Sequence, residues 1–165
     1  MNAVIRKACC GDEKILAYIQ TESWKAAFSG IVPDDVLAQY TEIKRVERMY
    51  AALLCESQLN GYVLETEGKA QCMAFWSASR ETDLPGYAEL ICIHSLPERW
   101  HQGYGSRMME TVLDDIRSAG YEKVMLWVFE DNARASGFYK KLGFADSKRR
   151  KQSFGSTEMM LERRL

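Results

Sequence analysis

The sequence predicts a mixed α/β (α+β) domain built on a central sheet. Apolar residues recur at helical spacing in the first third, short strand patterns follow between glycine turns, and one long amphipathic helix joins two of these strands. The chain has 165 residues, of which 47% are hydrophobic and three are proline. This size and composition suit one compact domain over residues 1–165, and no repeat, low-complexity tract or linker divides it.

The N-terminal third is expected to contain one short strand followed by helices. Residues 3–8 have a strand pattern, which Gly11 ends, and Asp12 is placed to cap the helix that follows. The apolar stripe of this helix consists of Ile15, Leu16, Ile19, Trp24, Phe28 and Ile31. Pro33 restarts the helix, which continues over residues 41–54.

The middle of the chain changes to strand patterns. Residues 62–64 and 71–76 flank a turn at 67–69, which predicts an antiparallel hairpin. A third strand is expected over residues 88–95. The polar stretch 80–86 between them contains a Pro-Gly pair and is therefore expected to be a surface loop.

A β-α-β unit is expected over residues 88–129. Residues 102–119 have a helical stripe that ends at Gly120, and residues 124–129 form an unbroken apolar run. Such a run is typical of a strand covered on both faces, which suits a parallel partner reached through a crossover helix. The stripe of the crossover helix consists of Met108, Met109, Val112, Leu113 and Ile116.

The chain is expected to end with a helix and two strands. Asn132 is a good helix cap, and Gly143 follows the last apolar residue of the helix. The strands are expected over residues 144–151 and 157–163, with a turn near Gly155.

Charge and cysteine content exclude several classes of protein. There are 22 Lys and Arg residues against 23 Asp and Glu residues, so we expect neither nucleic acid nor membrane as a partner. The basic run 148–151 lacks interleaved aromatic residues and is interpreted as a solvated hairpin. The five cysteines form no C-x-x-C pair and have no zinc-like spacing with the two histidines. With no signal or membrane-spanning segment, a cytoplasmic protein without a metal is expected.

Residues 100–106 are the first candidate binding site. Gly103 and Gly105 lie where a strand ends and a long helix begins, so backbone N–H groups can approach a phosphate closely at the positive end of the helix dipole. A simple strand-to-helix turn without a ligand would have the same pattern. A nucleotide-binding domain is a competing interpretation, but the Lys of a Walker loop and the third Gly of a dinucleotide fingerprint are both missing.

The chain resembles the GNAT family of N-acetyltransferases. Gly103 and Gly105 match its acyl-CoA loop, Arg/Gln-x-x-Gly-x-Gly/Ala, although Trp100 stands where the family has Arg or Gln. Residues 132–144 match its second pattern, Asn-x-x-Ala-x-x-Phe-Tyr-x-x-x-Gly-Phe, at every fixed position. The resemblance is specific over residues 89–144. It implies the GNAT fold, a central mixed and mostly antiparallel sheet of about six to seven strands flanked by helices, with a β-α-β cofactor-binding core.

The resemblance also implies an enzyme that uses acetyl-CoA as a co-substrate and acetylates an amine. The residues that would bind this cofactor are Ile93, His94, Ser95, Leu96, His101, Gln102, Gly103, Tyr104, Gly105, Ser106, Asn132 and Tyr139. Many members of the family form dimers, which makes a homodimer one expected assembly. No metal and no covalent enzyme intermediate is required.

Two residues are expected to handle protons. Tyr139 would donate to the departing thiolate, as the resemblance implies, because a tyrosine hydroxyl keeps its proton at neutral pH. Glu89 would take the proton of the amine, directly or through water, because it precedes Trp100 by the eleven residues found in histone-acetylating members. His94 is the second choice for the base, and strand alternation predicts that it lies on the face opposite Glu89.

The acceptor is an unidentified amine of a small molecule, an amino acid derivative or a peptide. We expect its site to involve Trp24, Phe28 and Arg80, together with Tyr40 and the loop 80–87. Trp24 and Phe28 could equally be core residues. A non-catalytic acyl-CoA-binding regulatory module is the alternative function, but such a module would need neither Tyr139 nor Glu89.

Overall fold

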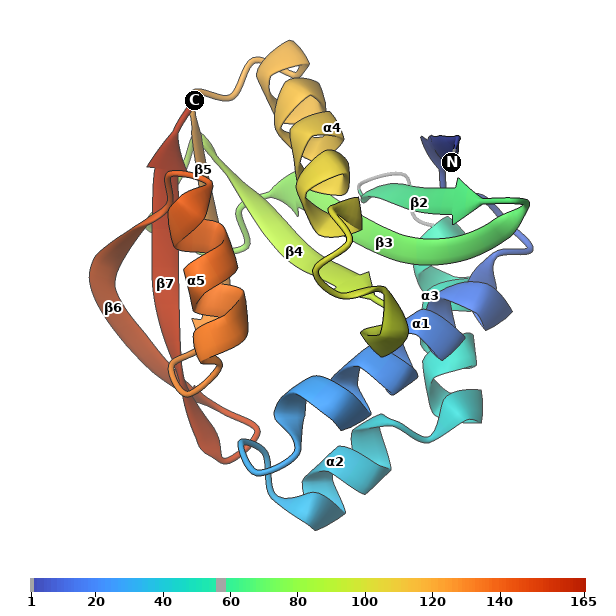
Figure 1. Ribbon diagram of the computed structural model, residues 1–165. Coiled ribbons are helices and arrows are strands. Elements are labelled where there is room, and N and C mark those ends of the chain that lie inside the picture. The colour runs from blue at the N-terminus through green and yellow to red at the C-terminus, as the bar shows by residue number, and fades with distance from the viewer. Residues whose placement is uncertain (1, 56–58) are drawn as a thin grey trace.

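The computed structural model describes residues 2–55 and 59–165. Its strands are β1 (Ala3–Lys7), β2 (Asn60–Thr66), β3 (Lys69–Ala78), β4 (Tyr87–Ser95), β5 (Lys123–Phe129), β6 (Ala145–Ser153) and β7 (Ser156–Arg164). Its α-helices are α1 (Glu13–Phe28), α2 (Asp34–Tyr40), α3 (Ile43–Cys55), α4 (Tyr104–Ser118) and α5 (Ala133–Lys141), and a 3-10 turn spans Pro97–Arg99. The mixed α/β fold and the order of elements are as predicted (Figure 1). None of the described helices is long and apolar enough to cross a membrane.

The seven strands form a single sheet in the order β1-β2-β3-β4-β5-β7-β6. Neighbouring strands are antiparallel except β4 and β5, which are parallel and are connected through α4. The predicted β2–β3 hairpin and the predicted β-α-β unit are both confirmed. The sheet is therefore mixed and mostly antiparallel, with seven strands.

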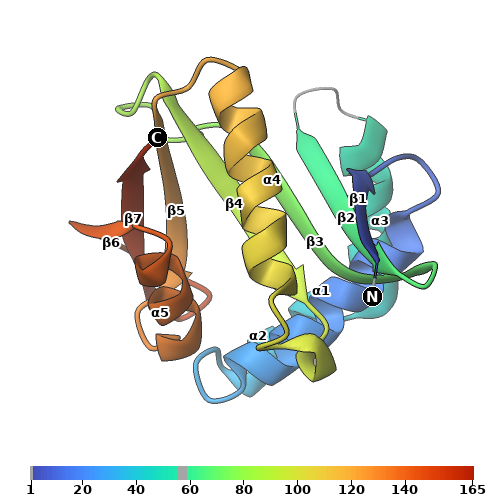
Figure 2. The ribbon, with the colours of Figure 1, turned by 45° about the horizontal axis from the view of Figure 1, so that its top comes forward.

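Helices cover both faces of the sheet. α4 and α5 lie on one face, and α1 and α3 lie on the other (Figure 2). Successive strand residues contribute to different cores, one on each face of the sheet. Leu64 belongs to the core with Met108 of α4, whereas Val63 belongs to the core with Leu16 of α1. We call these two sides the α4 face and the α1 face.

The β4 and β5 strands diverge soon after they pair. Only Tyr87, Ala88 and Glu89 of β4 pair with β5, opposite residues 123–125, although β4 continues to Ser95. The strands separate toward the carboxyl end of β4 (Figure 2). The β4 backbone beyond Glu89 therefore has no ladder partner on its β5 side.

A bulge in β4 changes which side chains face α1. Phe75 pairs with Cys92 and Trp76 pairs with Leu90, so Ile91 is an extra residue opposite β3. Beyond the bulge, Ile93 packs into the core of the α4 face and His94 contacts Trp24 of α1. Ala88 and Leu90 pack in the core of the α4 face, so Glu89 between them lies on the α1 face, as His94 does. The prediction that His94 lies on the face opposite Glu89 is therefore wrong, because simple alternation does not hold across a bulge.

The N-terminal helix begins as predicted but is not capped by the expected side chain. Asp12 is the N-cap residue of α1, yet its side chain makes no capping hydrogen bond. Both carboxylate oxygens accept hydrogen bonds from the Arg6 guanidinium, at 2.8 and 2.9 Å. Glu65 of β2 also binds Arg6, at 2.7 Å. The carboxylate of Asp12 therefore holds β1 against the start of α1.

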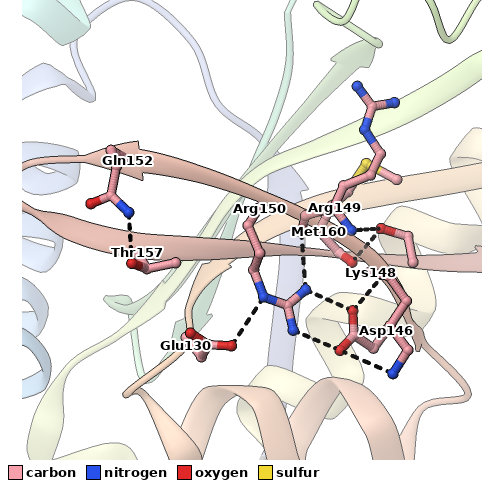
Figure 3. A network of polar contacts seen from close by, with 9 residues as sticks. Glu130, Asp146, Lys148, Arg149, Arg150, Gln152, Thr157 and Met160 are labelled. Atoms are coloured by element: carbon pink, nitrogen blue, oxygen red, sulfur yellow. Dashed lines mark hydrogen bonds and ion pairs between the residues drawn. The ribbon is translucent and has the colours of Figure 1, made fainter.

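The basic run of the β6–β7 hairpin is neutralised locally. Arg150 pairs with Asp146 and Glu130, and Lys148 also approaches Asp146 (Figure 3). The other two cations, Arg149 and Lys151, pair with Asp83 and Glu158 respectively. Each of the four positive charges therefore has a carboxylate partner within the domain.

Candidate active site

The loop before α4 presents a row of unbonded backbone N–H groups. His101 has φ of 63° and Gly103 has φ of 84°, which turns the chain sharply into the helix that begins at Tyr104. The first N–H group of this region that donates a hydrogen bond is that of Arg107, to the carbonyl of Gly103. The N–H groups of residues 101–106 have no acceptor within the described part of the chain. Such a row at the start of a 15-residue helix suits an anion with several oxygens.

Trp100 is held at the edge of this loop by two contacts. Its indole N–H donates to the carbonyl of Ser95 at 3.1 Å. The guanidinium of Arg134, on α5, lies 3.6 Å from the centroid of the Trp100 ring. Burial lowers the pKa of Arg134, and the described residues offer this guanidinium no carboxylate within ion-pair distance. A free positive charge therefore borders the row of N–H groups.

A groove of about 2010 Å³ crosses the molecule at the separation of β4 and β5 and brings most of the predicted site residues together. The predicted residues that line it are Trp24, Phe28, Arg80, Glu89, Ile93, His94, Ser95, His101, Gly103, Tyr104, Gly105, Ser106, Asn132 and Tyr139. Leu96 and Gln102 do not line it. Leu96 is buried with the core of the α1 face, and the side chain of Gln102 donates to the carbonyl of Glu98.

Asn132 and Tyr139 belong to α5 and line the groove, Asn132 as the N-cap residue and Tyr139 near the last turn of the helix. Asn132 caps α5, because its side-chain oxygen accepts the N–H of Ala135 at 3.2 Å. Tyr139 is 9% exposed and packs against Phe144, with ring centroids 5.9 Å apart. Burial raises the pKa of the Tyr139 hydroxyl, so this side chain keeps its proton throughout the neutral range.

Glu89 is almost completely buried and is bound to Arg80. One carboxylate oxygen accepts from the Arg80 backbone N–H and Nε, at 3.0 and 3.1 Å, and the other accepts from a terminal nitrogen at 2.8 Å. An ionised carboxylate can accept about four hydrogen bonds, so one position remains. The Glu89 contact also raises the pKa of Arg80. The pair fastens the loop after β3 to β4.

His94 is bound to α1 through Trp24. The indole N–H of Trp24 donates to Nε2 of His94 at 3.3 Å. Burial and the charge of Arg134 lower the pKa of His94 to about 4. His94 is therefore a neutral imidazole at physiological pH.

A family model described as Acetyltransferase (GNAT) family matches residues 21–144. This chain belongs to the GNAT acetyltransferase family. Among curated relatives of this GNAT protein, the spermidine N(1)-acetyltransferase of Thermoplasma acidophilum is 24% identical over 153 residues, which cover 87% of this chain and 89% of the relative. An uncharacterized N-acetyltransferase of Bacillus subtilis, YuaI, is 26% identical over 130 residues, covering 78% and 72%.

Solved structures agree on the GNAT fold. The crystal structure of the PaiA N-acetyltransferase from Thermoplasma acidophilum, in complex with coenzyme A, has a TM-score of 0.84 and 20% identity and covers all of both chains. The ribosomal-protein-S18-alanine N-acetyltransferase of Escherichia coli has a TM-score of 0.68 and 20% identity, over 98% of this chain and 92% of that one. At these identities the likeness concerns the fold.

The GNAT acetyltransferase has further groove residues that the sequence analysis did not select. Phe129 and Phe154 join Trp24 and Phe28 in a cluster of edge-to-face rings on the α1 face, with Phe28 and Phe129 4.9 Å apart and Trp24 and Phe154 5.5 Å apart. We call these four residues the aromatic cluster. Phe154 lies in a hairpin turn far along the chain, so periodicity alone could not place it there.

Two further groove residues, Arg134 and Glu158, were not predicted from the sequence. Arg134 lies inside the matched Asn-x-x-Ala pattern, at a position that the pattern leaves free. Glu158 is half-buried on β7, pairs with Phe129 in the sheet, and has a pKa raised by burial despite Lys151 at 3.7 Å. Within residues 2–55 and 59–165, no three His, Cys, Asp or Glu side chains are grouped so that they could hold a metal ion.

Proposed function

We propose that this protein transfers the acetyl group of acetyl-CoA by direct attack to a primary amine of a small molecule, an amino acid derivative or a peptide. The row of unbonded N–H groups at residues 101–106 is the observation that carries the proposal. It opens onto the same groove as Tyr139 and the diverging β4 strand. A cofactor with a diphosphate at one end and a thioester at the other fits this arrangement.

The cofactor would lie along the loop and β4. Its diphosphate would accept hydrogen bonds from the loop N–H groups, with help from the helix dipole. Its pantetheine arm would bond to the backbone of Ile93, His94 and Ser95, because this part of β4 has no strand partner on its β5 side. The PaiA structure of the same fold is in complex with coenzyme A, which supports a coenzyme A derivative as the cofactor.

The chemistry requires a proton acceptor and a donor. An alkylamine with a pKa of ~10 must lose a proton before it attacks the thioester. We assign that proton to Glu89, through the acceptor position that Arg80 leaves open or through a water. The tetrahedral oxyanion would be stabilised by a backbone N–H of the separated β4 segment. Tyr139 would donate a hydrogen bond to the departing thiolate, because burial keeps its hydroxyl protonated.

The acceptor would enter from the α1 face. The aromatic cluster and Tyr40 line that side of the groove, and Arg80 and Glu89 lie at its β4 edge. These rings suit an acceptor whose amine is attached to an apolar body. We also propose a cytoplasmic location, because the described cysteines are all free and acetyl-CoA is an intracellular metabolite.

A non-catalytic acyl-CoA-binding module remains the alternative. It would use the loop N–H groups but would not need Tyr139 or Glu89 in the same groove, and their presence there favours the enzyme.

Calorimetric titration with acetyl-CoA, followed by a thiol-release assay over amines, amino acids and short peptides, tests the proposal. Binding together with release for at least one amine supports the enzyme. Binding without release over the whole panel supports the module. A folded protein that does not bind acetyl-CoA contradicts both functions.

A further inference from the structure

The contact between Trp24 and His94 determines which imidazole nitrogen carries the proton. An indole nitrogen only donates hydrogen bonds, so the His94 Nε2 atom that receives it at 3.3 Å must be without a proton. In a neutral imidazole the single proton then lies on Nδ1. The tautomer of His94 is therefore set by a residue 70 positions earlier in the chain.

The indole that sets the tautomer is itself held in place. Trp24 packs edge-to-face against Phe28, with ring centroids 5.0 Å apart, and against Phe154, at 5.5 Å. These rings come from α1 and from the β6–β7 turn. The Trp24 N–H therefore stays directed at His94 unless the aromatic cluster is repacked.

The other nitrogen of His94, Nδ1, has no hydrogen-bond partner among the described residues. No residue in the described part of the chain accepts a hydrogen bond from Nδ1, and every fully buried side-chain nitrogen or oxygen there has a partner. Nδ1 is consequently not fully buried, and His94 lines the groove at the separated part of β4. A neutral donor with no protein partner thus lies at the groove in which the reactants would meet.

We propose that His94 serves the reaction as a neutral hydrogen-bond donor through Nδ1, to an oxygen atom of the bound reactants, and not as a base. This inference rests on the proposed acetyl transfer. His94 cannot accept a proton at Nε2 while Trp24 donates there, and Nδ1 already carries one. The oxygen is either the thioester carbonyl of the cofactor or an oxygen of the acceptor. No proton is transferred, because the hydrogen bond only stabilises negative charge on that oxygen.

Nitrogen-15 NMR of the histidine side chains tests the tautomer without any activity assay. The chain has only two histidines, so the His101→Asn variant identifies the His94 signals. We expect the Nδ1-protonated form and no titration of His94 between pH 5.5 and 8. A proton on Nε2, or a charged His94 in that range, would overturn the proposal.

Ligand titrations in the same experiment identify the oxygen. A non-reactive ketone analogue of acetyl-CoA that shifts the Nδ1 signals, where CoA itself does not, assigns the thioester carbonyl. A shift that appears only on adding an acceptor amine with an oxygen assigns the acceptor. If both ligands bind and neither shifts Nδ1, His94 is not a donor to the reactants. If the analogue does not bind, the proposed function fails, while the tautomer result still stands.

Two substitutions separate a donor from a base. The amide nitrogen of His94→Asn replaces Nδ1–H, whereas His94→Leu removes the donor, and neither variant can act as a base. A donor predicts that kcat falls about 10²-fold in His94→Leu and that most of the loss is recovered in His94→Asn. Equal losses in both variants, with acetyl-CoA affinity unchanged, would instead indicate a base.

Discussion

The guanidinium of Arg134 lies over the indole ring of Trp100, with its central carbon 3.6 Å from the ring centroid. Trp100 occupies the loop position at which the GNAT pattern has Arg or Gln, and Arg134 comes from the first turn of α5. Arg134 of α5 therefore places a positive charge beside Trp100, at the loop position where the family pattern has Arg or Gln. Because Arg134 has no carboxylate partner among the described residues, its charge is available to a phosphate.

Arg134→Gln should weaken acetyl-CoA binding about 10- to 100-fold, because a charge-assisted hydrogen bond to a phosphate contributes about 1.5–3 kcal/mol. Lys140→Gln is the matched control, since Lys140 is exposed on the same helix and does not line the groove. Calorimetric Kd values for both variants decide the matter. Equal affinities would exclude a phosphate contact by Arg134.

Gly103→Ala should reduce acetyl-CoA affinity strongly, because the added methyl group would occupy space beside the loop N–H groups. Its φ of 84° also costs an alanine about 1–2 kcal/mol of folding stability. Gly120→Ala supplies the control for that cost, as Gly120 has φ of 91° after the other end of α4, and no atom lies near its would-be Cβ. The Tm should fall by a similar amount in both variants, and only Gly103→Ala should lose affinity for acetyl-CoA. Normal affinity in folded Gly103→Ala would remove this loop from the cofactor site.

Tyr139→Phe should lower kcat by about 10²-fold and leave the Kd for acetyl-CoA nearly unchanged. The reason is that the phenyl ring keeps the packing against Phe144, while the hydroxyl that we propose as the donor to the thiolate is lost. Steady-state kinetics together with calorimetry measure the two effects separately. A variant with wild-type kcat would mean that the thiolate leaves without help from Tyr139.

Glu89→Gln should remove the acidic limb of the pH–rate profile for kcat/KM. A base must be ionised, so the rate of the unaltered enzyme falls as pH falls through the pKa of that base. Glu158→Gln is the comparison, because Glu158 lines the same groove and burial raises its pKa. If the limb vanishes in Glu158→Gln and persists in Glu89→Gln, Glu158 is the base, and Glu89 only fastens the loop through Arg80.

Asp12→Asn should destabilise the fold by about 1–3 kcal/mol at pH 7. Hydrogen bonds from Arg6 lower the pKa of Asp12 below its unfolded value of about 4, so the stabilisation exists above that value and disappears as pH falls through the folded pKa. In denaturant unfolding, the free energy of unfolding of the variant should therefore lie well below that of the wild type at pH 7. Near pH 2 the difference should be small. Asp114→Asn, in an exposed pair with Arg117, should cost less than about 1 kcal/mol at either pH.

The local patterns of the sequence were enough to predict much of this protein. Periodicity and turn residues predicted all seven strands and the main helices, and the unbroken run 124–129 predicted the parallel partner of β4. The spacing of Gly103 and Gly105, with residues 132–144, indicated the family that the family model then matched. These features depend on residues that are close together in the sequence. They can therefore be recognised from a single sequence.

Other features were decided only by contacts between distant segments. The bulge at Ile91 depends on how β4 packs against β3, and it moved His94 onto the α1 face, where Trp24 binds it. Likewise, Arg80 reached Glu89 because a loop folded back, and Arg134 reached Trp100 because α5 lies beside the α4 loop. The sequence by itself determined the elements and the glycine loop before α4. The tertiary structure decided the partners of the polar side chains, because hydrogen bonds and ring contacts form between whichever groups packing brings within a few ångströms.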